Sequence, residues 1–180
     1  MVRFLLCVVA VATSCGSLCR VSVADWPQFR GPDGDGHAQA QTLPIHWSET
    51  EGVIWKVPVP GLGWSSPVVS DGRIYVTTAV PSEAAADDNS DGHTLELLCF
   101  RAQDGHLVFR KVLFQQAGPV QMHKKNSHAS PTPVLYNNTI IVHYGPHGTA
   151  CTSLEGDIVW TCMLPYQPQH GNGGSPVLAD

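Results

Sequence analysis

Histidine is the residue type with which this sequence could most readily do chemistry. The chain has nine histidines among its 180 residues, and imidazole both ligates metal ions and titrates near neutral pH. Four of these histidines lie in or beside loops that precede strand-like segments, and two asparagines accompany them. These six residues form a candidate ligand-binding rim: His123, Asn126, His128, His147, His170 and Asn172.

Two interpretations of this rim are open. In the first, His128 and His170 hold similar places in successive repeats and line one face of the fold as a metal or small-ligand site. In the second, which we favour, the histidines hydrogen-bond loop backbone, and the asparagines are ordinary turn residues. The sequence contains no HxH, HExxH or Cys/His zinc spacing, so it assigns no metal ligand.

Catalysis by a nucleophile and binding of nucleic acid find little support. Residues 63–67 do not form a GxSxG nucleophile turn, and no catalytic residue is assigned. The 15 acidic residues outnumber the 10 lysines and arginines, which gives a net charge of −5. An acidic chain without a basic stripe lacks the electrostatic footprint for nucleic acid. The pair Lys124-Lys125 is therefore interpreted as a solvated loop.

The elements that would position the rim repeat along the chain. Similar segments begin at Pro67, Pro133 and Pro176. The second interval matches a propeller blade of about 40–45 residues, and the first fits one blade with an insertion. Residues 82–92 and 115–126 provide longer surface loops, and such insertions often gather on the binding face of a repeat array.

Each complete copy predicts four short strands joined by tight turns. The strand-like runs are rich in β-branched and aromatic residues and lie at 68–69, 73–78, 95–101, 107–114, 134–135, 139–144, 149–154 and 158–160. Asp71-Gly72 and Asn137-Asn138 tolerate the positive φ that two-residue hairpin turns need. No segment has a sustained helical period. The sequence therefore predicts an all-β fold of four-stranded antiparallel units, two of them complete and a third begun.

The first 24 residues have the layout of a secretory signal peptide. Arg3 precedes an apolar run that is too short to span a bilayer, and small residues before Ala24 favour cleavage after it. A lipid anchor at Cys15 is the alternative. Both interpretations predict a periplasmic or secreted protein that has no transmembrane span after leader removal, with a mature domain covering residues 25–180.

Three cysteines remain in the predicted mature chain, at positions 99, 151 and 162. An odd number outside a reducing cytosol allows one disulfide with one free thiol, or three buried thiols. Cys99 and Cys151 lie in strand-like runs, so we favour buried core cysteines.

The repeats resemble those of the pyrroloquinoline-quinone-like β-propeller family. The resemblance is carried by an acidic-Gly turn followed by an aromatic residue, at Asp104-Gly105 with Phe109 and again at 155–160. The opening 25–32, DWPQFRGP, resembles the start of exported bacterial members. In this family the ring packs into the neighbouring blade. The implied docking residues are Asp104, Gly105, Phe109, Glu155, Gly156 and Trp160.

This resemblance implies that the chain carries only the first blades of a ring that closes with four to eight. Because Phe109 replaces tryptophan and lacks an indole N–H, we expect one inter-blade hydrogen bond to be missing. Trp64 could stack on a ligand, although a packing role between blades is the favoured interpretation.

Two functions are compatible with the resemblance. The preferred one is a non-catalytic binding or assembly scaffold in the cell envelope, whose partner is a protein, a polysaccharide or a small molecule. The alternative is a quinone-dependent alcohol or sugar oxidoreductase with pyrroloquinoline quinone and calcium in the propeller funnel. The vicinal cysteine pair of such enzymes is absent from this sequence.

Overall fold

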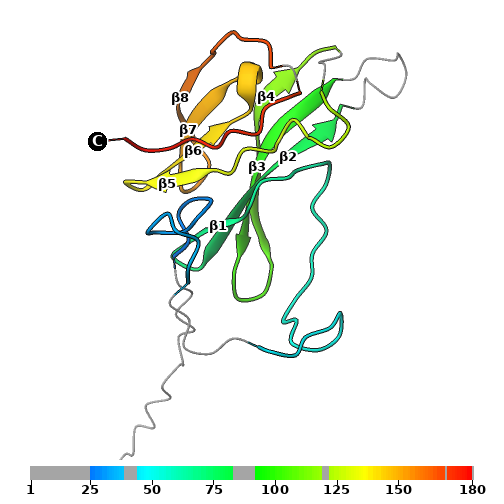
Figure 1. Cartoon of the computed structure of the whole chain (residues 1–180), viewed down its shortest axis with the longest axis vertical. Coiled ribbons are helices and arrows are strands. Elements are labelled where there is room, and N and C mark those ends of the chain that lie inside the picture. Colours follow the sequence, from blue (N-terminus) through cyan, green and yellow to red (C-terminus); the bar gives the residue numbers. More distant parts are fainter. Residues whose placement is uncertain (1–24, 39–43, 83–91, 119–121, 169, 180) are drawn as a thin grey trace, which may run out of the picture.

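The described part of the chain folds into two four-stranded antiparallel sheets, and it contains no α-helix (Figure 1). The structure is a computed structural model, and it describes residues 25–38, 44–82, 92–118, 122–168 and 170–179. The predicted all-β fold of four-stranded units is confirmed. The predicted leader with Cys15, and most of the insertion at 82–92, lie outside the described residues.

The first sheet has the strand order β1-β2-β3-β4. Its strands are β1 (Val68–Ser70), β2 (Arg73–Pro81), β3 (His93–Arg101) and β4 (Leu107–Gln116). Asp71 and Gly72 connect β1 to β2 with φ values of 46° and 70°, as a type I′ hairpin turn requires. The pairs Val68–Tyr75 and Tyr75–Cys99 set the register, so alternate side chains of β1, β2 and β3 share one face.

The second sheet repeats this order as β5-β6-β7-β8. Its strands are β5 (Val134–Tyr136), β6 (Thr139–His143), β7 (Thr149–Ser153) and β8 (Ile158–Cys162). Asn137 and Asn138 form the first hairpin turn with φ values of 46° and 59°. A short 3-10 helix, η2 (Gly145–His147), connects β6 to β7. The predicted hairpins are therefore present in both units.

The hydrophobic core lies between the two sheets. Leu95, Leu97 and Cys99 of β3 belong to one buried cluster with Ile140 and Val142 of β6. The buried phenol of Tyr144 crosses between the sheets and donates to the backbone oxygen of Glu96 at 2.7 Å. Because each sheet buries its face against the other, neither forms this core alone.

The opposite face of β3 carries a buried carboxylate. Glu96 is 1% exposed, and its side chain accepts hydrogen bonds from the guanidinium of Arg110 and from the Thr94 hydroxyl. Burial by itself would raise the pKa of Glu96, but these hydrogen bonds outweigh it and hold the pKa below its usual range. The charge is thus paired, as a buried carboxylate must be.

The N-terminal segment ties the two sheets together. The backbone N–H of Trp26 donates to Val69 at 2.8 Å and its carbonyl accepts from Val69 at 2.9 Å. The next carbonyl, of Pro27, accepts from the N–H of Leu135 in β5 at 2.8 Å. Gly31 closes the turn beneath the Trp26 ring, where a Cβ would come within 2.8 Å of the indole. The segment therefore bridges β1 and β5.

The three cysteines of the described chain are free thiols. Cys99 and Cys151 are buried, which confirms the interpretation as core cysteines. Cys162 is exposed on β8, so the alternative with three buried thiols is wrong for that position. No helix in the described ranges is long and apolar enough to cross a membrane.

Candidate functional site

A tryptophan that precedes β1 docks on the turn between β3 and β4. The ring of Trp55 lies over Gly105, where a Cβ would come within 2.6 Å of the ring. The indole N–H donates to the backbone oxygen of Ala102 at 2.8 Å. Gly105 has a φ of 72°, a conformation that L-residues avoid. Only glycine therefore gives both the turn and the space for the ring.

The same contact recurs one unit later, between β4 and the turn that connects β7 to β8. The ring of Phe109 lies over Gly156, where a Cβ would come within 2.8 Å of the ring. The loop carbonyl that corresponds to Ala102 belongs to Leu154, and it accepts from the Tyr75 hydroxyl at 3.3 Å and from Arg73 Nη1 at 3.2 Å. The expected loss of a hydrogen bond is thus compensated, because other donors occupy this carbonyl.

Acidic residues support these two turns from the outside. Asp104 accepts from Arg101 Nε at 2.8 Å and from the backbone N–H of His106 at 3.0 Å, and these bonds lower its pKa. Glu155 pairs with Arg73 across the sheets at 3.4 Å. The third ring of the series, Trp160 on β8, is 44% exposed.

A relay of hydroxyl groups connects the starts of three successive repeats. The residue before each Pro-Val step is Ser66, Thr132 or Ser175. The backbone N–H of Ser66 donates to Thr132 Oγ1 at 3.0 Å, and the N–H of Thr132 donates to Ser175 Oγ at 3.0 Å. The same bond therefore relates the first copy to the second and the second to the third.

An open depression lies beside this relay. Its volume is about 490 Å³, within the roughly 300–1,000 Å³ typical of small-ligand sites. Its lining combines equivalent positions of three repeats with residues of two loops: Phe29, Trp64, Lys125, Asn126, Ser130, Thr132, Gly173 and Ser175. Trp64 is 65% exposed, so it does not pack between the sheets as the sequence led us to favour.

Part of the predicted rim lies next to this depression. The rings of His123 and His170 meet edge to face with centroids 5.7 Å apart. The amide nitrogen of Asn126 donates to the backbone oxygen of His170 at 2.9 Å, and its Oδ1 accepts from the N–H of Ser127. These residues hold the two loops together, which is the structural role of the second interpretation.

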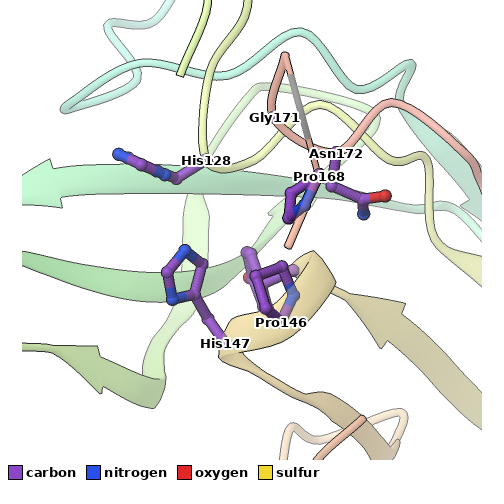
Figure 2. A pocket seen from close by; sticks show the side chains of 7 residues that line it. His128, Pro146, His147, Pro168, Gly171 and Asn172 are labelled. Carbon is purple, nitrogen blue, oxygen red and sulfur yellow. The ribbon is translucent and has the colours of Figure 1, made fainter. Parts of the chain in front are cut away.

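The remaining rim residues line a separate, much smaller crevice (Figure 2). His128 and His147 lie on one side of it, and Asn172 lies on the other with Pro168 and Gly171. The crevice encloses about 10 Å³, room for about one water molecule. It is therefore too small for an organic ligand.

Histidines cluster at this crevice. The rings of His93 and His128 have centroids 4.8 Å apart, and those of His128 and His147 are 5.4 Å apart. Burial, with smaller contributions from the neighbouring His93 and His147, lowers the pKa of His128 to about 4. Burial and His93 also lower the pKa of His147. These two imidazoles are therefore neutral at pH 7.

The cluster does not amount to a metal centre. Within the described residues, no group of three or more His, Cys, Asp or Glu side chains is placed to hold a metal ion. The nearby His143 donates to or accepts from the Thr149 hydroxyl at 2.7 Å, and burial lowers its pKa.

Three features of the site were missed by sequence reasoning. Trp55 lies after the acidic-Gly pair Glu51-Gly52, as the ring of the docking motif does, but with one residue fewer between the glycine and the ring. This pattern could have identified Trp55 from the sequence. The hydroxyl before each Pro-Val step was also visible in the sequence. His93 had no such signal, because it lies far from His128 in the sequence and the two rings meet only in the folded chain.

Comparison with known proteins gives no assignment. No protein-family model matches the chain, and the search of curated proteins finds no match.

Proposed function

We propose that this chain is an exported binding scaffold, built from blades of the pyrroloquinoline-quinone-like propeller type, that holds a ligand where its repeats begin. The observation that carries the proposal is the meeting of three equivalent repeat positions around one depression. Trp64, Ser130 and Gly173 occupy the same place in successive copies, and all three line it.

The contacts between units support the propeller arrangement. Successive copies are related by the same hydroxyl bond, and a ring docks on an acidic-Gly turn twice, at Gly105 and Gly156. Recurrence of the same kinds of contact between successive units is what stacking of repeats produces. In such a ring the innermost strands, here β1 and β5, lie nearest the axis, so a ligand at the repeat starts would sit near the centre.

The alternative, a quinone-dependent oxidoreductase, finds a poor fit in these residues. Calcium takes six to eight oxygen ligands, with carboxylates prominent among them. No aspartate or glutamate is found among the described residues that line the depression, and the described side chains form no metal-binding group. We therefore derive no redox step from this site.

A binding screen on the purified chain tests the proposal. The panel contains neutral and acidic oligosaccharides, short peptides, and pyrroloquinoline quinone with calcium, and isothermal calorimetry reports the affinity for each. We expect at least one member to bind, and the double variant Phe29→Ala with Trp64→Ala to weaken that binding at least tenfold. Both rings are more than half exposed, so their removal should leave the fold intact.

Trp47→Ala is the matched control. Trp47 is 79% exposed and does not line the depression, so its removal should leave binding unchanged. If no panel member bound, or if Trp47→Ala and the Phe29/Trp64 double variant lost affinity equally, the proposed binding face would be wrong. Reduction of a dye in the presence of an alcohol, quinone and calcium would instead favour the oxidoreductase.

A further inference from the structure

Two hydroxyl groups of the relay belong to residues that line the depression. Thr132 Oγ1 and Ser175 Oγ each accept a backbone N–H in the relay. A hydroxyl that accepts in this way still has its own proton to donate. Asn126, by contrast, already uses its amide nitrogen and its oxygen within the loops. The Ser175 hydroxyl is therefore available to a ligand as a donor, whereas Thr132 is only 2% exposed and holds Ser66 in place behind it.

Lys125 gives the depression its charge. It is exposed, and in the described part of the chain its ammonium group enters none of the five ion pairs. Among the described residues that line the depression it is the sole charged one, although the whole chain carries a net charge of −5. A cation in an otherwise acidic protein favours an anionic ligand. The sequence-based interpretation of residues 124–125 as a solvated loop does not account for the position of Lys125 in the lining.

Two aromatic rings from separate segments complete the site. Phe29 follows the N-terminal bridge and Trp64 precedes β1, and they are 56% and 65% exposed. Aromatic side chains that are apolar on the face and, for tryptophan, polar at one edge are well suited to a ring with one apolar face. A pyranose has such a face, and its hydroxyl oxygens accept hydrogen bonds from donors around its edge.

We infer that the depression binds a carboxylated sugar, a hexuronate unit of an acidic polysaccharide. The inference rests on the proposed function and names its ligand. Lys125 pairs with the carboxylate, Trp64 and Phe29 pack against the C–H face of the pyranose, and the Ser175 hydroxyl donates to one of its hydroxyl oxygens. The open form of the depression leaves room for the glycan chain to continue beyond the bound unit.

The test compares trigalacturonate with the neutral galactose trimer, by calorimetry on the full chain. We expect the acidic trimer to bind at least tenfold more tightly in 50 mM salt and to lose that advantage in 500 mM salt, because salt screens exposed charges. Lys125→Met should reduce the affinity for the acidic trimer to that for the neutral one. Lys124→Met, which removes a neighbouring charge outside the lining, should change neither.

Three outcomes would overturn the inference. Equal affinity for the two trimers, with Trp64→Ala still abolishing binding, would contradict the acidic ligand and keep the binding face. Binding of pyrroloquinoline quinone but of neither sugar would also contradict the acidic sugar as the ligand while keeping the binding face. Equal losses in Lys124→Met and Lys125→Met would show that the chain's overall charge, not the depression, selects the sugar. Absence of any Trp64-dependent binding would instead contradict the proposed function itself.

Discussion

Trp55 and Trp160 end the same kind of motif and have opposite surroundings. Trp55 lies over the turn at Gly105 and donates its indole N–H to Ala102. Trp160 lies on β8, all of whose residues are exposed, and its own side chain is 44% exposed. Each ring follows an acidic-Gly turn, although Trp55 lies in an extended segment before β1 and Trp160 lies within a strand. The difference shows that the ring is buried by the following unit, not by its own.

Phe109 stands between these two cases and makes the comparison testable. Its ring is partly buried on the Gly156 turn and packs against the core. Stability in a repeat array is the sum of terms within units and terms between neighbours. A ring over a turn should therefore contribute where the neighbouring turn covers it, and should contribute little where the ring faces solvent.

The largest effect is expected for Gly156→Ala. The new Cβ would sit at a φ of 84°, within 2.8 Å of the Phe109 ring and 2.9 Å of the Lys111 side chain. A left-handed conformation costs an L-residue roughly 1–2 kcal/mol, and overpacking costs about 1–3 kcal/mol more. Urea denaturation should show a loss of about 3 kcal/mol in the free energy of unfolding.

Gly72→Ala provides the control for this variant. Gly72 has a φ of 70°, and a Cβ there would meet no atom within 4 Å, so only the backbone cost of roughly 1–2 kcal/mol applies. Equal losses for Gly72→Ala and Gly156→Ala would mean that the ring contact imposes no constraint. Adding Phe109→Ala to Gly156→Ala should recover part of the loss, because the steric conflict disappears.

A somewhat smaller effect is expected for Phe109→Ala. A fully buried phenylalanine costs about 3–5 kcal/mol on truncation, and partial burial reduces the expected loss to about 2 kcal/mol. Trp160→Ala should change the free energy of unfolding by less than about 0.5 kcal/mol, as exposed positions usually do. The two variants measured by urea denaturation at one pH form a direct contrast. A loss in Trp160→Ala as large as that in Phe109→Ala would contradict the comparison.

The sequence predicts much of this arrangement, for reasons of local physics. β-branched runs and residues that tolerate positive φ specify hairpins, so the turns at Asp71 and Asn137 could be placed from sequence alone. The docking motif draws attention to Phe109, whose ring lies over the turn at Gly156. Its spacing also conceals Trp55, because one residue fewer separates that ring from its glycine.

The candidate site was less predictable, because it depends on contacts between distant segments. The six rim residues look alike in sequence, yet they divide between two hollows and a loop-to-loop junction. Phe29 reaches the large depression because Trp26 and Pro27 pair with β1 and β5. No periodic pattern reports such a bridge, since it is made only when both sheets are in place.

The next prediction concerns Tyr75→Phe, which removes a hydrogen bond at the Phe109 contact and leaves the ring. The hydroxyl donates to Leu154, and a hydrogen bond of this kind contributes about 1 kcal/mol. We expect Tyr75→Phe to lower the free energy of unfolding at pH 7 by about that amount. An unchanged stability would mean that Arg73 alone satisfies the Leu154 carbonyl.

Alkaline pH sharpens this prediction. Burial, with a smaller contribution from the neighbouring Cys99, raises the pKa of Tyr75 to about 12. The unfolded phenol, with a pKa near 10, ionises first, so stability contributed by the neutral phenol is present below pH 10 and is lost between pH 10 and 12. Phenylalanine has no such loss. The difference between wild type and Tyr75→Phe should therefore shrink toward zero at pH 11, and a constant difference would contradict the assignment.

The smallest effect is expected for the ion pairs that cross the same contact. Lys111 pairs with Asp157 at 3.3 Å and Arg73 with Glu155 at 3.4 Å, and all four side chains are substantially exposed. Exposed pairs contribute about 0–1 kcal/mol and are screened by salt. Asp157→Asn and Glu155→Gln should each change the free energy of unfolding by less than about 0.5 kcal/mol. Losses larger than that of Phe109→Ala would show that ion pairs, not the ring over its turn, hold the two units together. The contrast between Trp55 and Trp160 would then reflect a missing ion pair and not an uncovered ring.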